Sequence, residues 1–241
     1  MTSVLPLSLK KVSIGYDGHS VANDVSFDVK SGEVFGFIGL NGEGKTTLIK
    51  TLLGLRDALN GDISVFRYPS GSRDAKRNVA YLPEKFMPAW FMNGNEFVRF
   101  SASLYGKDVE NEEIASMARA LALDASFLSN RVHTYSKGMG QKLGLIATIL
   151  TGASLLVLDE PMSGLDPLAR MRVKRVLLEC KKNGQTVFLS SHILSDLDEL
   201  CDTIAVLDSG EVKYLGAPAQ LKKDMNSELL EKAFLSVIGR D

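Results

Sequence analysis

The sequence predicts an α/β fold with a mainly parallel sheet, an antiparallel β subdomain at the N-terminus and an α-helical subdomain in the middle of the chain. The first strands alternate apolar and polar residues around a short turn, as antiparallel strands do. Residues 85–135 have helical spacing, and strands alternate with helices after them, which is typical of a parallel sheet. With 241 residues, 45% of them hydrophobic, the chain can form one large core.

The apolar spacing and the turns between apolar runs place the expected elements. Strands are expected at 7–14, 21–29, 33–38, 63–66, 79–82, 155–158 and 186–190. The first two strands flank a turn at Asp17-Gly18, and a terminal hairpin turns at Ser209-Gly210. Helices are expected at 45–54, 95–104, 112–121, 139–150 and 167–182.

We expect a single domain over residues 1–241, because no linker, repeat or low-complexity stretch divides the chain. Within it, the helical subdomain covers residues 85–135, and residues 216–241 form a short C-terminal extension. Residues 221–241 have the spacing of one short amphipathic helix. Its apolar side would carry Leu229, Leu230, Ala233, Phe234 and Val237.

The composition argues against several classes of function. The formal net charge is −1, the sequence pI is about 6.3 and the basic residues are scattered, so we expect no nucleic-acid partner. The most apolar window, 143–158, is interrupted by small and polar residues and is too short to span a membrane. The first residues do not resemble a secretory signal, and we expect a cytoplasmic protein. Neither Cys180 nor Cys201 belongs to a metal-binding or redox motif.

Residues 39–47 carry the strongest functional motif. They match the phosphate-binding loop G-x-x-x-x-G-K-[ST] at every fixed position and join an expected strand to an expected helix. In such a loop backbone N–H groups surround the phosphates, Lys45 supplies positive charge to the terminal phosphates, and Thr46 offers its hydroxyl to Mg²⁺. The predicted nucleoside triphosphate site consists of Gly39, Leu40, Asn41, Gly42, Glu43, Gly44, Lys45, Thr46 and Thr47.

A second motif places two adjacent carboxylates at the end of the apolar strand 155–158. Asp159 is expected beside the phosphate loop, where it can hold Mg²⁺ directly or through water, because hard cations prefer oxygen ligands. Successive side chains of a strand point to opposite faces, so Glu160 is aimed differently. Glu160 is the expected catalytic base, which polarises the attacking water. The two motifs together predict a P-loop NTPase core.

Further motifs follow in an order that resembles the ATP-binding subunit of an ATP-binding cassette (ABC) transporter. Residues 135–142 resemble the family's signature motif, 163–166 its D-loop, 190–192 its switch-histidine segment and 81–84 its Q-loop. Tyr16 lies where the family carries the aromatic side chain that stacks on adenine. The resemblance covers nearly the whole chain. It implies an ABC ATPase that hydrolyses ATP to ADP and phosphate and drives a separate transmembrane permease from the cytoplasmic face of the membrane.

The resemblance also implies two ATP molecules held between two chains in a head-to-tail dimer. The signature residues of one chain, Ser136, Lys137, Gly138 and Met139, would clasp the γ-phosphate bound by the phosphate loop of the other. His192 would reach the γ-phosphate and the attacking water, and Asp166 would couple the two sites. A second copy of this chain is the expected partner, although a chain with complete motifs can also pair with a different ATP-binding subunit.

Two motifs depart from the usual pattern of the family, the signature at Lys137 and Met139 and the Q-loop at Glu84. The signature reads S-K-G-M in place of S-G-G-Q, a form that resembles the bacterial ABC-2 exporter branch. The Lys137 side chain can add charge near the γ-phosphate or point to solvent. Glu84 stands where many relatives carry glutamine, and its carboxylate can bind Mg²⁺ through oxygen. We hypothesise that Glu84 senses Mg²⁺ and relays to the membrane subunit, which gives Thr46, Glu84 and Asp159 as the metal set.

Large apolar side chains follow Glu84 at once. The resemblance places the groove for the permease's coupling helix here, with Phe86, Met87, Trp90 and Phe91 as contact residues. The same residues can instead pack the core of the helical subdomain, and both interpretations can hold for different residues.

Two other functions remain as alternatives. ABC ATPases that act on nucleic acid or ribosomes usually carry two cassettes or long coiled-coil insertions, whereas this chain has one cassette and no heptad run. A binding module that barely hydrolyses ATP is disfavoured by the intact Asp159-Glu160 pair and by His192. The transported substrate depends on the membrane subunit, so this sequence does not rank the classes of cargo.

Overall fold

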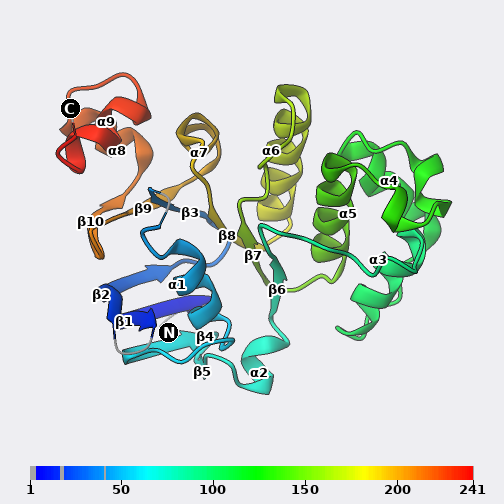
Figure 1. Ribbon diagram of the computed structural model, residues 1–241, viewed down its shortest axis with the longest axis horizontal. Helices are drawn as coiled ribbons and strands as arrows, with labels where there is room; N and C mark the ends of the chain where they lie inside the picture. Colours follow the sequence, from blue (N-terminus) through cyan, green and yellow to red (C-terminus); the bar gives the residue numbers. More distant parts are fainter. Residues whose placement is uncertain (1–3, 17–18, 41, 241) are drawn as a thin grey trace.

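The computed structural model describes residues 4–16, 19–40 and 42–240, and the strands in this part of the chain form two sheets (Figure 1). The smaller sheet is antiparallel, with the strand order β2-β1-β4-β5. Its strands are β1 (Leu7–Tyr16), β2 (His19–Val29), β4 (Asn60–Val65) and β5 (Tyr68–Pro69). The antiparallel sheet predicted at the front of the chain is confirmed. Its predicted turn at Asp17-Gly18 lies outside the described residues.

The larger sheet has the order β10-β9-β3-β8-β7-β6 and is parallel except for its edge strand β10. Its strands are β3 (Val34–Gly39), β6 (Val79–Leu82), β7 (Leu155–Asp159), β8 (Thr186–Ser190), β9 (Thr203–Asp208) and β10 (Glu211–Gly216). This confirms the mainly parallel sheet and the terminal hairpin. Because the parallel strands run in one direction, their carboxyl ends lie at one edge, which is where ligands bind in open α/β sheets.

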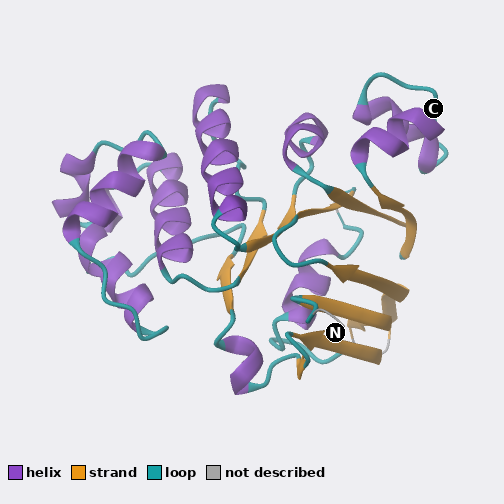
Figure 2. Cartoon of the chain, turned by 180° about the vertical axis from the view of Figure 1, so that it is seen from behind, coloured by secondary structure: helices purple, strands orange, loops and turns teal. Residues whose placement is uncertain are grey.

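The parallel sheet is covered on both faces (Figure 2). Side chains alternate along β3, so that Val34 and Ile38 join one core cluster while Phe35 and Phe37 join the other. The second cluster lies against the smaller sheet, where the Phe27 and Phe35 rings stack with their centroids 4.9 Å apart. The antiparallel sheet is thus fixed to the parallel one by buried aromatic contacts.

Helices cover the two faces unequally. One face carries α1 (Lys45–Leu52), and the other carries α5 (Lys137–Leu150), α6 (Pro167–Lys182) and α7 (Leu194–Leu200). Between β6 and α5 the chain forms α3 (Gly94–Ser103), α4 (Asn111–Ala120) and two short 3₁₀ turns at Ala125–Ser129 and Val132–Thr134. These elements gather around α5, at the end of the molecule away from the smaller sheet (Figure 1). They occupy the region predicted to be helical, while its role as a separate subdomain stays a prediction.

Several predicted boundaries were wrong. The helix expected at 139–150 begins at Lys137, because the Ser136 side chain caps it by accepting from the Met139 N–H. The sequence also gave no prediction of α7 or of the short α2 (Arg73–Lys76). Here the local apolar spacing was too short to show a helix.

The C-terminal segment is two helices instead of the one predicted. They are α8 (Pro218–Asp224) and α9 (Leu230–Val237), and Asn226 between them has a φ of +49°, which turns the chain. Leu230, Ala233 and Phe234 are buried as expected, but Leu229 precedes α9 and is 54% exposed. Both helices pack against α7, so this segment covers its own chain.

Candidate active site

The phosphate loop joins β3 to α1 at the carboxyl edge of the parallel sheet. Gly44 caps α1 in the left-handed conformation, with φ of +94°, and a β-carbon there would lie 2.6 Å from Cγ1 of Val21. The fold therefore requires glycine at this position. The Lys45 ammonium donates to the carbonyl oxygens of Gly39, at 2.6 Å, and Leu40, at 3.0 Å. Of the nine predicted loop residues, only Asn41 lies outside the described part of the chain.

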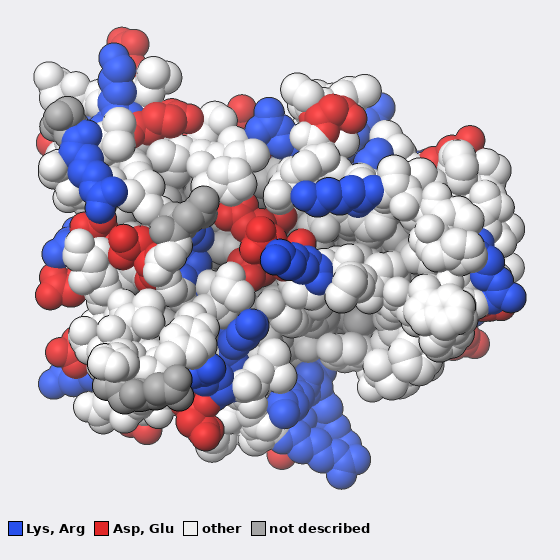
Figure 3. Space-filling view, in the orientation of Figure 1, with Lys and Arg blue, Asp and Glu red and all other residues white. Residues whose placement is uncertain are grey.

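Burial and neighbouring carboxylates act in opposite directions on Lys45. Its side chain is largely buried, and this burial lowers the pKa of the ammonium. Negative charges of Glu160, Asp159, Glu43 and Glu84 raise that pKa and offset part of the effect. Acidic side chains gather near the middle of this face of the molecule, with basic ones beside them (Figure 3). A polyphosphate entering so acidic a site needs cations to balance its charge.

Asp159 is hydrogen-bonded through both carboxylate oxygens. The Thr46 hydroxyl donates to Oδ2 at 2.9 Å, and the Ser190 hydroxyl donates to Oδ1 at 2.5 Å. Asp159 and Ser190 are register partners on the parallel strands β7 and β8, and Asp159 is 1% exposed. The structure therefore brings together the predicted metal residues Thr46 and Asp159.

Glu160 and His192 form a contact between the ends of β7 and β8. The Nδ1 atom of His192 lies 2.7 Å from Oε2 of Glu160. Glu160 follows the last residue of β7 and has a φ of +51°, so its direction is set by a turn of the backbone and not by strand alternation, as the sequence analysis assumed. Burial raises the pKa of the Glu160 carboxyl, while His192 and Lys45 lower it by smaller amounts.

Tyr16 ends β1 close to the first turn of α1. Its hydroxyl and the Thr47 hydroxyl are 2.7 Å apart, so the predicted base-stacking residue lies beside the phosphate loop. The guanidinium of Arg56 lies over the Tyr16 ring, and no motif or spacing in the sequence predicts this contact.

The predicted signature and D-loop residues begin two neighbouring helices. Ser136 caps α5, and Gly138 and Met139 lie in its first turn. Asp166 caps α6 by accepting from the Ala169 N–H at 2.9 Å. Lys137 is exposed and lies along the D-loop, where a β-carbon on Gly164 would be 3.3 Å from its Cε. All five of these predicted residues are exposed or half-buried: Ser136, Lys137 and Asp166 are exposed, and Gly138 and Met139 are half-buried.

Glu84 does not contact the other predicted metal residues. It is exposed, and no hydrogen bond or ion pair in the described part of the chain joins it to Thr46 or Asp159. It lies within electrostatic reach of the site. Burial is the main cause that raises the pKa of Tyr81 to about 12, and the negative charges of Asp159 and Glu84 both add to this rise. Across the described residues, no cluster of three or more His, Cys, Asp or Glu side chains could hold a metal by itself.

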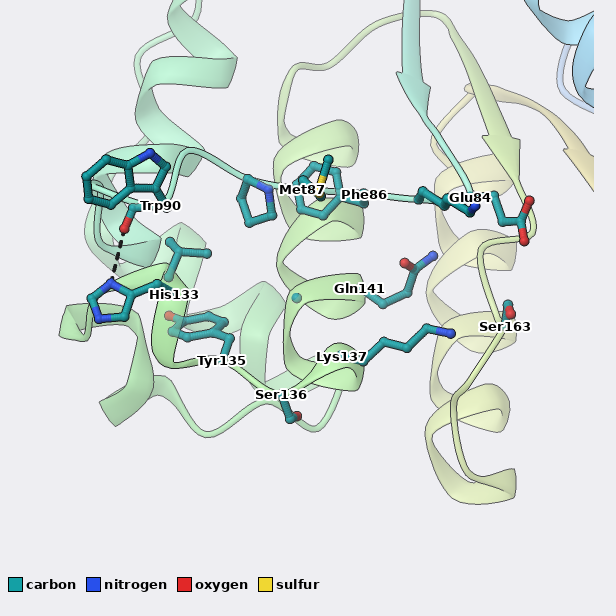
Figure 4. A pocket seen from close by; sticks show the side chains of 14 residues that line it. Glu84, Phe86, Met87, Trp90, His133, Tyr135, Ser136, Lys137, Gln141 and Ser163 are labelled. Carbon is teal, nitrogen blue, oxygen red and sulfur yellow. Dashed lines mark hydrogen bonds between the residues drawn. The ribbon is translucent and has the colours of Figure 1, made fainter.

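Glu84 lines a hollow of about 420 Å³ next to the site (Figure 4). Lys137, Gln141 and Ser163 lie near Glu84, and Trp90 and His133 lie at the opposite end. Two of the residues that depart from the family pattern, Glu84 and Lys137, therefore border the same space.

The four apolar residues after Glu84 divide between core and surface. Phe86 is half-buried and meets Phe97 edge to face, with the ring centroids 5.6 Å apart. Met87, Trp90 and Phe91 are 88%, 71% and 54% exposed. Phe86 thus packs against the core, as the second interpretation predicts, whereas Met87, Trp90 and Phe91 are exposed and their contact with a permease stays a prediction.

The sequence analysis assigned no role to two residues that support the site, Ser190 and Gln141. Ser190 accepts from the Glu160 backbone N–H, at 3.1 Å, besides donating to Asp159. Gln141 on α5 donates to the Pro161 carbonyl oxygen at 3.2 Å and thereby ties the signature helix to the segment after Glu160. The only sequence signal was that each stands inside or beside a recognised motif.

This fold and this site define a P-loop NTPase of the cassette type. The family model described as ABC transporter matches residues 22–163, and the chain belongs to this family, whose ATP-binding domains are ATPases. A model for an AAA domain also matches residues 130–197. No helix in the described residues is both long enough and apolar enough to cross a bilayer.

Individual relatives agree with this family. An uncharacterized ABC transporter ATP-binding protein of Synechocystis is 39% identical over 82% of this chain, which spans 56% of that relative. A fluoroquinolones export ATP-binding protein of Mycobacterium tuberculosis is 36% identical over 82% of this chain, which spans 65% of it. The solved structure of an ATP-binding subunit of an ABC transporter is 32% identical, with a TM-score of 0.86, and the match covers 96% of this chain and 98% of that one.

Proposed function

We propose that this protein hydrolyses ATP as the nucleotide-binding subunit of an ABC exporter and thereby drives a separate transmembrane subunit. The observation that carries the proposal is the meeting of Lys45, the Thr46–Asp159–Ser190 contacts and the Glu160–His192 pair at one edge of the sheet. Export is favoured by the S-K-G-M signature and by the similarity to the fluoroquinolones export protein. The proposed location is the cytoplasmic face of the membrane, where the permease would hold the subunit.

Each residue has a part in the proposed reaction. Lys45 would exchange its two loop carbonyl partners for phosphate oxygens and stabilise their charge. Glu160 would orient the attacking water and accept its proton, and His192 would hold Glu160 in place while reaching the γ-phosphate. Tyr16 would stack on the adenine.

The described residues fit a Mg²⁺ site that is completed by the nucleotide. The Thr46 hydroxyl and the Asp159 carboxylate are hard oxygen donors that already face each other, and Mg²⁺ usually takes only one or two carboxylates plus phosphate oxygens and water. The ion would neutralise charge on the phosphates in this acidic site. Glu84 is the third proposed residue of the set, and its place there rests on the Q-loop pattern.

The proposed assembly is a head-to-tail dimer. Among the described residues, no hydrogen bond or ion pair joins Ser136, Lys137, Gly138 or Met139 to the chain's own phosphate loop. Ser136 stands at the N-terminus of the 14-residue helix α5, whose N–H groups and dipole favour an anion. We infer that this surface binds the γ-phosphate held by a second subunit, and that Asp166 lies at the same interface.

The deciding experiment compares the wild type with Glu160→Gln in Mg²⁺-ATP. The variant is expected to lose ATP hydrolysis by about a hundredfold or more, because the base is removed, and to accumulate as an ATP-bound dimer. Hydrolysis is measured by phosphate release and the oligomeric state by size-exclusion chromatography with light scattering. Normal hydrolysis by the variant would contradict the role of Glu160, and the absence of a dimer in either protein would contradict the shared ATP sites.

A further inference from the structure

Tyr16 is held by the first turn of α1 and by the segment after this helix. At the start of the helix, the Thr47 hydroxyl lies 2.7 Å from the Tyr16 hydroxyl. In the segment after the helix, the Arg56 guanidinium carbon lies 3.9 Å from the centre of the Tyr16 ring. The same guanidinium donates through Nη1 to the carbonyl oxygen of Gly15 at 2.8 Å. Tyr16 is therefore fixed at its hydroxyl, at one ring face and at the preceding peptide.

The segment that carries Arg56 is docked onto the end of β1. The Leu59 N–H donates to the Ser13 carbonyl oxygen at 2.8 Å. A β-carbon on Gly15 would lie 2.9 Å from Cδ1 of Leu59 and would clash with the His19 carbonyl oxygen, so glycine permits this close approach. Arg56 is itself half-buried. The guanidinium thus has a defined position under the ring, unlike a freely moving surface cation.

A guanidinium on one face leaves one face of the ring for another flat group. Tyr16 is still 41% exposed with the guanidinium in place, so part of this residue remains open to a ligand. A cation over an aromatic face attracts the ring and restrains its rotation. A ring with restrained rotation loses less conformational freedom when a nucleobase stacks on it.

We propose that Arg56 is a positioning residue for the nucleotide base, holding the Tyr16 ring so that the base stacks on the face opposite the guanidinium. The inference rests on the proposed function, because it assumes that Tyr16 receives the adenine. It adds a residue outside the recognised motifs to the base site, and it makes the segment after α1 part of that site.

The test compares a ligand with the base and a ligand without it. Binding of Mg²⁺-ADP and of Mg²⁺-pyrophosphate is measured by calorimetry for the full chain, both wild type and Arg56→Ala. Arg56→Ala is expected to weaken ADP about two- to fivefold, the range of an exposed cation–π contact, and to leave pyrophosphate unchanged. Arg56→Lys, which keeps a cation, is expected to retain most of the ADP affinity. In a Tyr16→Ala background, Arg56→Ala is expected to have no further effect.

Three results would overturn the inference. Unchanged ADP affinity in Arg56→Ala would show that the cation does not matter. Tighter ADP binding would show that the guanidinium occupies the face that the base needs. An equal loss for ADP and pyrophosphate would assign Arg56 to support of the phosphate loop. A wild type that binds neither ADP nor ATP would instead contradict the proposed function, so the two failures are distinguishable.

Discussion

At the scale of single residues, Glu160 is a site residue whose backbone conformation and burial lower the stability of the folded protein. Its backbone has a φ of +51°, its side chain is largely buried, and burial raises the pKa of its carboxyl. Strained and desolvated groups of this kind gather at functional sites, where the fold holds them for chemistry. The Ser190 contacts to its backbone N–H and the His192 contact to its carboxylate are what hold this residue in place.

We expect Glu160→Gln to be more stable than the wild type at neutral pH. The folded-state pKa of Glu160 is raised above its ordinary value of 4.5, so the protonated carboxyl stabilises the fold below pH 4.5 and this contribution is lost as the pH rises through the folded pKa. Thermal unfolding without nucleotide, followed from pH 4 to pH 8, should therefore show the two proteins converging at the acid end. Glu228→Gln, at an exposed site, is the control and should show no such divergence. A wild type at least as stable as Glu160→Gln at pH 8 would refute this account.

At the scale of elements, α5 connects the signature to the helical region and the Q-loop. It starts at the Ser136 cap, and its middle packs against Phe86 and Leu82 at Gly144. A β-carbon on Gly144 would lie 2.6 Å from Cδ1 of Leu82 and 2.9 Å from Cδ1 of Phe86. Glycine here allows α5 to approach the segment that follows β6.

A matched pair of glycines in α5 tests this packing. Gly144→Ala is expected to lower the free energy of unfolding by about 1–2 kcal/mol, because the added methyl group overpacks a buried contact. Gly140→Ala is expected to raise it by about 0.5 kcal/mol, since alanine favours a helix and no atom lies within 4 Å of the added β-carbon. Chemical denaturation of both variants gives the comparison. If Gly144→Ala proved as stable as Gly140→Ala, the contact would be looser than the structure indicates.

At the scale of the whole molecule, the exposed side chains after Glu84 are the strongest candidates for contact with a membrane subunit. The Trp90 and Phe91 rings meet edge to face with their centroids 5.8 Å apart, and the Trp90 carbonyl oxygen lies 3.3 Å from Nδ1 of His133 (Figure 4). The Trp90 backbone is thus fixed while its indole remains exposed. An exposed aromatic side chain on a fixed backbone is typical of a binding hot spot.

Trp90→Ala is expected to weaken binding of the purified permease subunit by about tenfold or more without changing thermal stability. Leu229→Ala, which also removes an exposed apolar side chain, is the control and should leave binding unchanged. Binding is measured by biolayer interferometry with the permease in detergent. Unchanged affinity in Trp90→Ala would remove this residue from the proposed interface.

The sequence by itself determined most of the fold and which residues of the two main motifs lie together. Both motifs are contiguous stretches of sequence, so they can be found without the tertiary structure. One is a glycine-rich loop between an apolar strand and a helix, and the other is a pair of carboxylates at the end of another apolar strand. Parallel strands must end at the same edge, so the meeting of Thr46 with Asp159 follows from topology. Local pattern also predicted the bounds of the helix at 167–182 and of the strand at 186–190. The apolar pattern of the helix is long, and the strand ends at clear turns.

Only the tertiary structure decided which residues surround these motifs. Periodicity shows that a side chain is apolar on one face of an element, but the partner that covers it is distant in sequence. For example, the sequence did not show that Phe86 packs against the core while Trp90 lies at the surface. Nor did it show that Arg56 lies over the ring of Tyr16, which precedes Arg56 by 40 residues. The turn at Asn226 likewise split the expected C-terminal helix, because packing against α7 outweighs a weak local pattern. Contacts between distant residues depend on the packed arrangement of the whole chain, which no local pattern contains.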